Sequence, residues 1–194
     1  MQELRNLTDA IWINILMVVT SIPIVTVGAA ITAAHDANRR ALQGEAGGVT
    51  RNYFKAFRAN FAKSTALWAV FGITGAALAY AWVALQITPL LVPKIGLTLV
   101  WIIGFEWVFA LQARFENTVG RTLANAFVFG ISHILLTVGM IVLDAIWVGL
   151  LAACWFLFPQ GLFLLVVMGY GTMILCHIPL LERGFAQYLK SGEE

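Results

Sequence analysis

Three ionisable side chains lie inside apolar stretches of this chain: Glu106, His133 and Asp144. A charged side chain at the centre of a bilayer costs roughly 2.5–3.5 kcal/mol on insertion scales, so such a group should face protein and be paired or protonated. On one continuous helix, His133 and Asp144 would share a face but lie about 16 Å apart along the axis. Glu106 could then contact either of them across a helix interface.

Three interpretations of this intramembrane polar site stay open. The side chains could form a path for protons or substrate, they could be buried polar groups that fix the helix register, or a shifted segment boundary could expose them to lipid headgroups. His35 and Asp36 are expected to mark the cytoplasmic end of the first apolar segment, and His177 to be satisfied by its own surroundings.

Local motifs for chemistry are missing from the sequence. No HExxH, CxxC or paired-histidine spacing occurs, so we predict neither a metal site nor a cofactor. No phosphate-binding loop and no GxSxG elbow occurs either. We therefore predict that the chain is not an enzyme and cannot be its own ATPase.

The segments that carry these side chains have the composition of a membrane protein. Hydrophobic residues make up 60% of the 194 residues and charged residues 11%, whereas soluble domains are about 25% charged. About 20 apolar residues span a bilayer core of roughly 30 Å, and the backbone there must be helical. We predict an all-α, polytopic transmembrane helical bundle forming a single membrane domain, 1–194, with about five spans at 10–34, 64–87, 95–113, 124–156 and 162–181.

Pro23 interrupts the first of these spans. A proline inside a helix removes a hydrogen bond and kinks or breaks the helix. The segment is therefore either a kinked full span or a broken, re-entrant segment folded about Pro23. In the second case both chain termini lie on the same side of the membrane.

The lysines and arginines fix the expected orientation. They concentrate in the first loop, the third-to-fourth loop and the C-terminal tail, and the alternate loops carry only Lys94. The positive-inside rule places the basic loops and the C-terminus of a multi-pass membrane protein in the cytoplasm. The small net charge of +2 indicates no nucleic-acid partner. The basic residues are Arg39, Arg40, Arg51, Lys55, Arg58, Lys63, Arg114, Arg121, Arg183 and Lys190.

The first cytoplasmic loop contains an aromatic pattern with helical spacing. Its aromatic residues fall on one helical face, and basic residues are interleaved with them. This pattern is typical of an amphipathic helix in the membrane interface, where cations meet anionic headgroups. The helix is either a simple interfacial connector or a docking surface for a partner. The residues concerned are Tyr53, Phe54, Lys55, Phe57, Arg58 and Phe61.

Three stretches together resemble the YesL-like family of small bacterial integral membrane proteins of unknown function. They are the Pro23-broken segment 21–29, the aromatic loop 53–61, and 113–117 with 122–126. The likeness singles out Pro23, Arg114, Phe115 and Asn117 as family-motif residues. Family members often have a proline in the third span, where this chain reads Phe109-Ala110-Leu111-Gln112.

The resemblance implies a link to sugar uptake, because members of the family look like neighbours of carbohydrate ABC importers. We therefore expect an accessory or regulatory membrane subunit of such an importer. Its partners would be importer permease or ATPase subunits and membrane lipids, and a homo-oligomer is compatible with the sequence. The alternative is a small independent transporter or channel that uses the intramembrane carboxylates Glu106 and Asp144.

Overall fold

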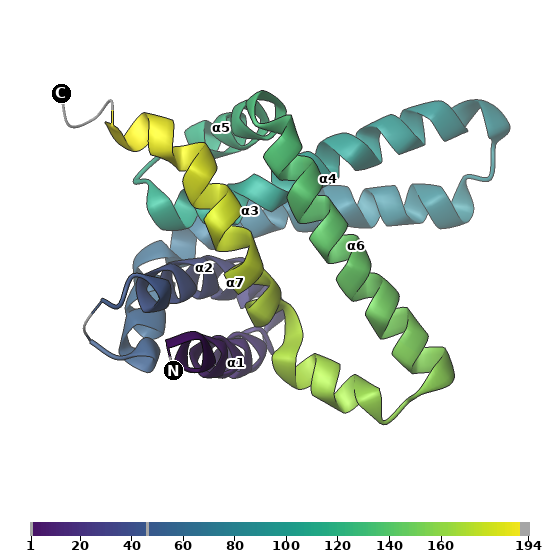
Figure 1. The fold of residues 1–194 in the computed structure, drawn as a ribbon. Coiled ribbons are helices and arrows are strands. Elements are labelled where there is room, and N and C mark those ends of the chain that lie inside the picture. The colour runs from purple at the N-terminus through teal and green to yellow at the C-terminus, as the bar shows by residue number, and fades with distance from the viewer. Residues whose placement is uncertain (1, 46, 191–194) are drawn as a thin grey trace.

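The fold is entirely helical over the part of the chain described by the computed structural model, residues 2–45 and 47–190. The C-terminal residues 191–194 lie outside the described residues. Seven α-helices and two 3-10 turns follow one another without a strand in the described ranges, which confirms the predicted all-α class (Figure 1). They are α1 (Gln2–Thr20), η1 (Ile24–Thr26), α2 (Val27–Leu42), α3 (Val49–Ala84), η2 (Thr88–Leu90), α4 (Leu91–Arg114), α5 (Val119–Ser132), α6 (Ile134–Leu157) and α7 (Gly161–Lys190).

Four of the described segments are long and apolar enough to cross a membrane: Val49–Ala84, Thr88–Arg114, Ile134–Leu157 and Gly161–Ala186. They correspond to the expected spans 64–87, 95–113, 162–181 and the second part of 124–156. The first expected span has no continuous helical counterpart. The chain is thus a multi-pass helical membrane protein with four candidate spans.

The first apolar segment is broken at Pro23 and is not a single kinked helix over 10–34. α1 ends at Thr20, and α2 begins at Val27 after the turn η1. The hydroxyl of Thr26 donates to the carbonyl oxygen of Pro23 at 2.6 Å and so satisfies a backbone group at the break. α1 and α2 then pack against each other. The broken-segment alternative describes this region, because Pro23 cannot donate the helical hydrogen bond.

α2 is the buried centre of the bundle. It packs against α1, α3, α4 and α7, and all its residues from Gly28 to Asn38 are buried. A Cβ atom on Gly28 would collide with the backbone oxygen of Ser64 and with Trp68. Only glycine therefore allows α3 to approach this closely. The hydroxyls of Thr32 and Ser64, 2.8 Å apart, join the two helices inside the core.

α3 is much longer than one membrane span. Its 36 residues extend over about 54 Å, against a bilayer core of roughly 30 Å. The apolar part from Ser64 to Ala84 matches the bilayer by itself, so the basic part from Val49 to Lys63 projects beyond it. The predicted amphipathic segment is therefore helical, but it continues directly into the span instead of forming a separate helix.

The expected span 124–156 is wrong at its start, because the helix breaks at His133. His133 has φ −114° and ψ 46°, and it separates α5 from α6. The hydroxyl of Thr137 donates to the carbonyl of Gly130 at 2.8 Å and satisfies a backbone group at the break. α5 has 14 residues and measures about 21 Å, too short to cross a bilayer.

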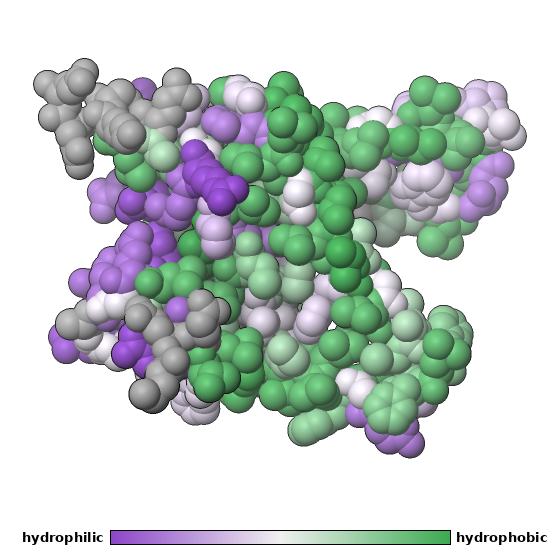
Figure 2. Space-filling model, viewed as in Figure 1, coloured by the Kyte–Doolittle hydropathy of each residue, from purple (hydrophilic) through white to green (hydrophobic). Residues whose placement is uncertain are grey.

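The spans form two hairpins that diverge from a common base. α3 with α4 and α6 with α7 extend to the right of the view, and both chain ends lie at the left (Figure 1). The hydrophilic surface gathers mainly at the left, whereas the hairpins are largely hydrophobic (Figure 2). At the far end, Lys94 donates to the carbonyl of Leu85 at 2.9 Å and lies over the ring of Trp82. The charge asymmetry predicted from the loops is thus visible as an asymmetry between the two ends of the molecule.

α7 is kinked at Gly169, whose φ of 53° is in the left-handed region that favours glycine. Asn14 of α1 lies against the kink. Its amide nitrogen donates to the carbonyls of Val166 and Val167 at 3.0 and 2.9 Å. Backbone groups freed by the kink are thereby satisfied from another helix.

Candidate functional site

A polar cluster of Glu106, Asp144 and His177 lies where α4, α6 and α7 meet. Nδ1 of His177 is 3.9 Å from Oε2 of Glu106, and Nε2 is 3.3 Å from Oδ1 of Asp144. One oxygen of each carboxyl group and one ring nitrogen of His177 lie within 4.8 Å of one another. One imidazole thus lies between two carboxyl groups that come from different helices.

The cluster is deeply buried except at Asp144. Exposed side-chain fractions are 4% for Glu106 and 2% for His177, against 27% for Asp144. Oε2 of Glu106 and Nε2 of His177 are buried without a hydrogen-bond partner. Charge interactions also link His35 to His177 and Asp144, and Tyr170 to both carboxylates. The cluster is therefore a polar centre with unsatisfied donor and acceptor atoms.

Trp107, the neighbour of Glu106, fixes the position of the cluster. Its side chain is fully buried, and its indole nitrogen donates to the hydroxyl of Thr137 in α6 at 2.9 Å. Its ring also stacks edge-on against Phe185 of α7, at 5.7 Å between centroids. A Cβ on Gly184 would come within 2.6 Å of the indole, so glycine there lets α7 approach. α4, α6 and α7 are thus packed around one tryptophan.

The structure assembles the polar site differently from the sequence analysis. Glu106 was expected to contact either His133 or Asp144, and Asp144 is its neighbour. His133 is not part of the cluster. It lies at the helix break, where its ring stacks on Phe129 at 5.7 Å and its Nδ1 is 3.3 Å from the carbonyl oxygen of the same residue.

His177 was missed as a member of the cluster. Its ring nitrogens were expected to find partners in their immediate surroundings, whereas the polar contacts of His177 are with α4 and α6. Because the three residues lie on different helices, no residue spacing along a single helix predicts this arrangement. The available signal was the burial cost of a histidine in an apolar segment, which requires a partner somewhere in the bundle.

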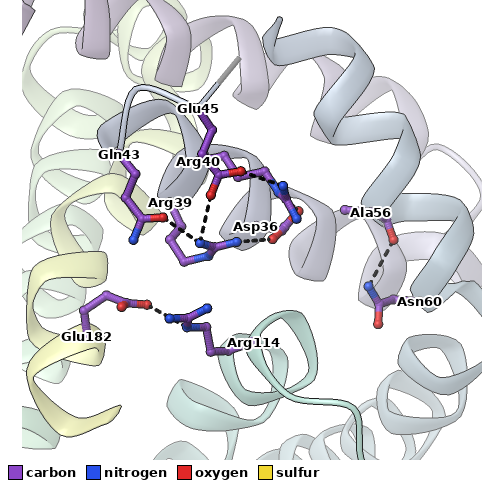
Figure 3. Close-up of polar contacts among 9 residues, drawn as sticks. All are labelled: Asp36, Arg39, Arg40, Gln43, Glu45, Ala56, Asn60, Arg114 and Glu182. Atoms are coloured by element: carbon purple, nitrogen blue, oxygen red, sulfur yellow. Dashed lines mark hydrogen bonds and ion pairs between the residues drawn. The ribbon is translucent and has the colours of Figure 1, made fainter. Parts of the chain in front are cut away.

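A second polar site occupies the hydrophilic end of the molecule (Figure 3). Asp36 accepts hydrogen bonds from Arg39 and Arg40 at 2.8 and 2.7 Å, and Glu45 pairs with Arg40 at 2.6 Å. The hydrogen bond to Asp36 raises the pKa of the Arg40 guanidinium. His35 and Asp36, expected at the cytoplasmic end of the first apolar segment, are buried within α2, which continues to Leu42.

A cavity of about 350 Å³ opens beside this network. Cationic side chains from α2, α3 and α4 line it, and Asp36 and Glu116 contribute the opposite charge. Arg114 at the end of α4 is also ion-paired with Glu182 of α7 at 3.4 Å. The cationic residues in the lining are Arg39, Arg40, Lys63 and Arg114.

The aromatic face of α3 divides into a buried and an exposed part. Tyr53 is fully buried, and its hydroxyl is 2.6 Å from that of Thr20. The prediction that Tyr53 belongs to an exposed interface is therefore wrong. Phe57 is half-buried and packs against the core. Phe54 and Phe61 remain exposed, at 38% and 40%, and Arg51, Lys55, Arg58 and Lys63 are exposed around them.

The family-motif residues lie at junctions between helices. Pro23 forms the bend between α1 and α2, and Arg114 ends α4. Phe115 packs edge-on against Phe185 of α7, at 5.3 Å between ring centroids. Asn117 is half-buried in the turn before α5.

These observations define a polytopic helical membrane protein with a buried polar centre and a basic end. Residues 10–82 match the model of a family described as "Protein of unknown function, DUF624". No curated protein and no solved structure matches the chain. The match covers α2 and most of α1 and α3, and it ends before Glu106, Asp144 and His177.

Proposed function

We propose that the chain is a member of the YesL-like group and acts as an accessory or regulatory membrane subunit of a bacterial carbohydrate ABC importer. It resides in the plasma membrane with its basic end and C-terminus in the cytoplasm. The supporting observation is the projecting part of α3, where Phe54 and Phe61 are exposed beside Lys55 and Arg58. Exposed aromatic residues with a basic rim suit contact with an importer permease or ATPase subunit at the membrane surface.

The position of this surface supports docking more than simple anchoring. The basic part of α3 is rigidly joined to the span, since both belong to one helix. It also borders the cavity lined by Arg39, Arg40 and Arg114. A partner bound there would therefore be coupled mechanically to the core helix α2 and to the spans.

Copurification from the native bacterium tests this proposal. The double variant Phe54→Ser with Phe61→Ser should lose the importer subunits but still insert into the membrane. The matched control is Phe57→Leu, because that side chain packs toward the core. Equal recovery of importer subunits with the wild type and the double variant would contradict the proposal.

The alternative function is an independent transporter or channel that uses Glu106 and Asp144. The observation that favours it is that both carboxyl groups are in one intramembrane cluster, with Asp144 still partly exposed. Purified protein in liposomes should then move substrate or protons without any other subunit. Flux that disappears in Glu106→Gln would favour this alternative over the accessory role.

A further inference from the structure

We infer that Glu106, Asp144 and His177 form a binding site for a divalent transition-metal ion of the Zn²⁺ class. The inference is independent of the accessory role. Each residue offers one ligand atom, and these atoms all lie within 4.8 Å of one another. One imidazole nitrogen and two carboxylate oxygens form a donor set that Zn²⁺ accepts.

The ligand atoms are close enough to hold a shared ion once the side chains rotate. Zn²⁺ binds nitrogen and oxygen donors at about 2.0–2.2 Å, so two donors lie ~3.4 Å apart at a tetrahedral angle. Nε2 of His177 is 3.3 Å from Oδ1 of Asp144, close to this separation, whereas the 3.9 Å to Oε2 of Glu106 is measured from the other ring nitrogen, Nδ1. A pair of ligand atoms at the 4.8 Å limit would close by about 1.4 Å through rotation of the two side chains. Three protein ligands leave a fourth position open.

Unsatisfied atoms point to a ligand independently of the cluster itself. Oε2 of Glu106 and Nε2 of His177 are buried without a hydrogen-bond partner. More than nine-tenths of each of these side chains is buried. Native proteins rarely leave such atoms unpaired, because each costs about 1–3 kcal/mol. A bound ion would satisfy both of them at once.

The charge balance selects a cation over a water molecule. Fully ionised, the two carboxylates carry more negative charge than one imidazolium can neutralise. Within the described residues, no lysine or arginine lies within 4 Å of either carboxylate. A divalent cation with two carboxylates and a neutral imidazole is neutral as a unit, which removes most of the cost of burial.

Zn²⁺ titration of the purified, chelator-treated chain in detergent tests the inference, with Co²⁺ as a spectroscopic substitute. We expect about one ion per chain and a higher Tm with Zn²⁺, because binding to the folded state alone stabilises it. The variants Glu106→Gln and Asp144→Asn keep the side-chain size and should weaken Zn²⁺ binding at least about tenfold, the lower end of what loss of even an outer-shell partner costs.

Two control variants and a competing ion make the result decisive. His133→Asn and Glu182→Gln remove similar groups outside the cluster and should bind Zn²⁺ like the wild type. Equal binding by the wild type and Glu106→Gln, or no binding by a folded wild type, would overturn the inference. Tighter binding of Mg²⁺ than of Zn²⁺ would overturn the choice of ion class.

Discussion

The side chain of Asn14 in α1 accepts a hydrogen bond at 3.1 Å from the backbone nitrogen of Gly171 in α7, near the other end of the chain. A Cβ on Gly171 would come within 2.7 Å of the Asn14 backbone, so the two helices touch there. The first helix is thereby bound to the last at the point where the last one is kinked.

Replacement of this asparagine should destabilise the kink. Asn14→Ala leaves two carbonyls and one backbone nitrogen without their partner, so we expect a loss of about 1–3 kcal/mol. Thermal unfolding in detergent measures it. Thr8→Ala on α1 is the control, because its exposed hydroxyl bonds only within its own helix. Equal Tm values for the two variants would show that the contact with α7 contributes nothing.

Close packing of α2 on α3 predicts a difference between two glycines. Gly28→Ala places a methyl group against Ser64 and Trp68 and should cost about 1–3 kcal/mol through overpacking. Gly96→Ala in α4 meets no atom within 4 Å and should be neutral or slightly stabilising, because alanine favours helix. The Tm difference between the two variants is the measurement, and a more stable Gly28→Ala variant would refute the close approach.

The ion pair between α4 and α7 predicts a charge-reversal result (Figure 3). Arg114 and Glu182 are 3.4 Å apart and about a quarter exposed. Arg114→Glu should lower stability by about 0.5–1 kcal/mol, the range of partly exposed pairs. The double variant with Glu182→Arg should recover part of the loss in a thermal denaturation experiment. Additive effects of the two single changes would show that the side chains do not interact.

The orientation predicts which positions an external reagent reaches. In a Cys154→Ser, Cys176→Ser background, Arg58→Cys on the projecting part of α3 should react with an impermeant maleimide only after cell lysis. Gln86→Cys, in the turn at the opposite end, should react in intact cells. Both side chains are exposed, so accessibility depends on the side of the membrane. Labelling of position 58 in intact cells would invert the orientation.

The elements were largely predictable from the sequence because bilayer length and proline chemistry act locally. Pro23 indicated either a kink or a break in the first segment, and four of the five expected spans correspond wholly or in part to helices that could cross a membrane. The break at His133 was not predicted, since no proline marks it and Thr137 stabilises it from the following helix. The helical period alone could not reveal a hydroxyl that replaces the missing backbone bond.

The polar site was only half predictable for a similar reason. Burial cost identified Glu106 and Asp144 as groups that need partners, but it could not rank partners on different helices. His177 joins them because α7 packs against α4 and α6 around Trp107. That packing depends on the small size of Gly184. The sequence alone does not show that a tryptophan from another helix lies against this glycine.

The central position of α2 has a consequence for biogenesis. With 16 residues, α2 measures about 24 Å and is too short to be inserted as a span. It also carries buried polar groups, and the side chain of Asn38 donates to the carbonyl of Gly171 in α7 at 3.2 Å. We therefore expect α2 to stay at the membrane surface while the spans are inserted. Its contacts with α7 can form only after α7 has left the ribosome.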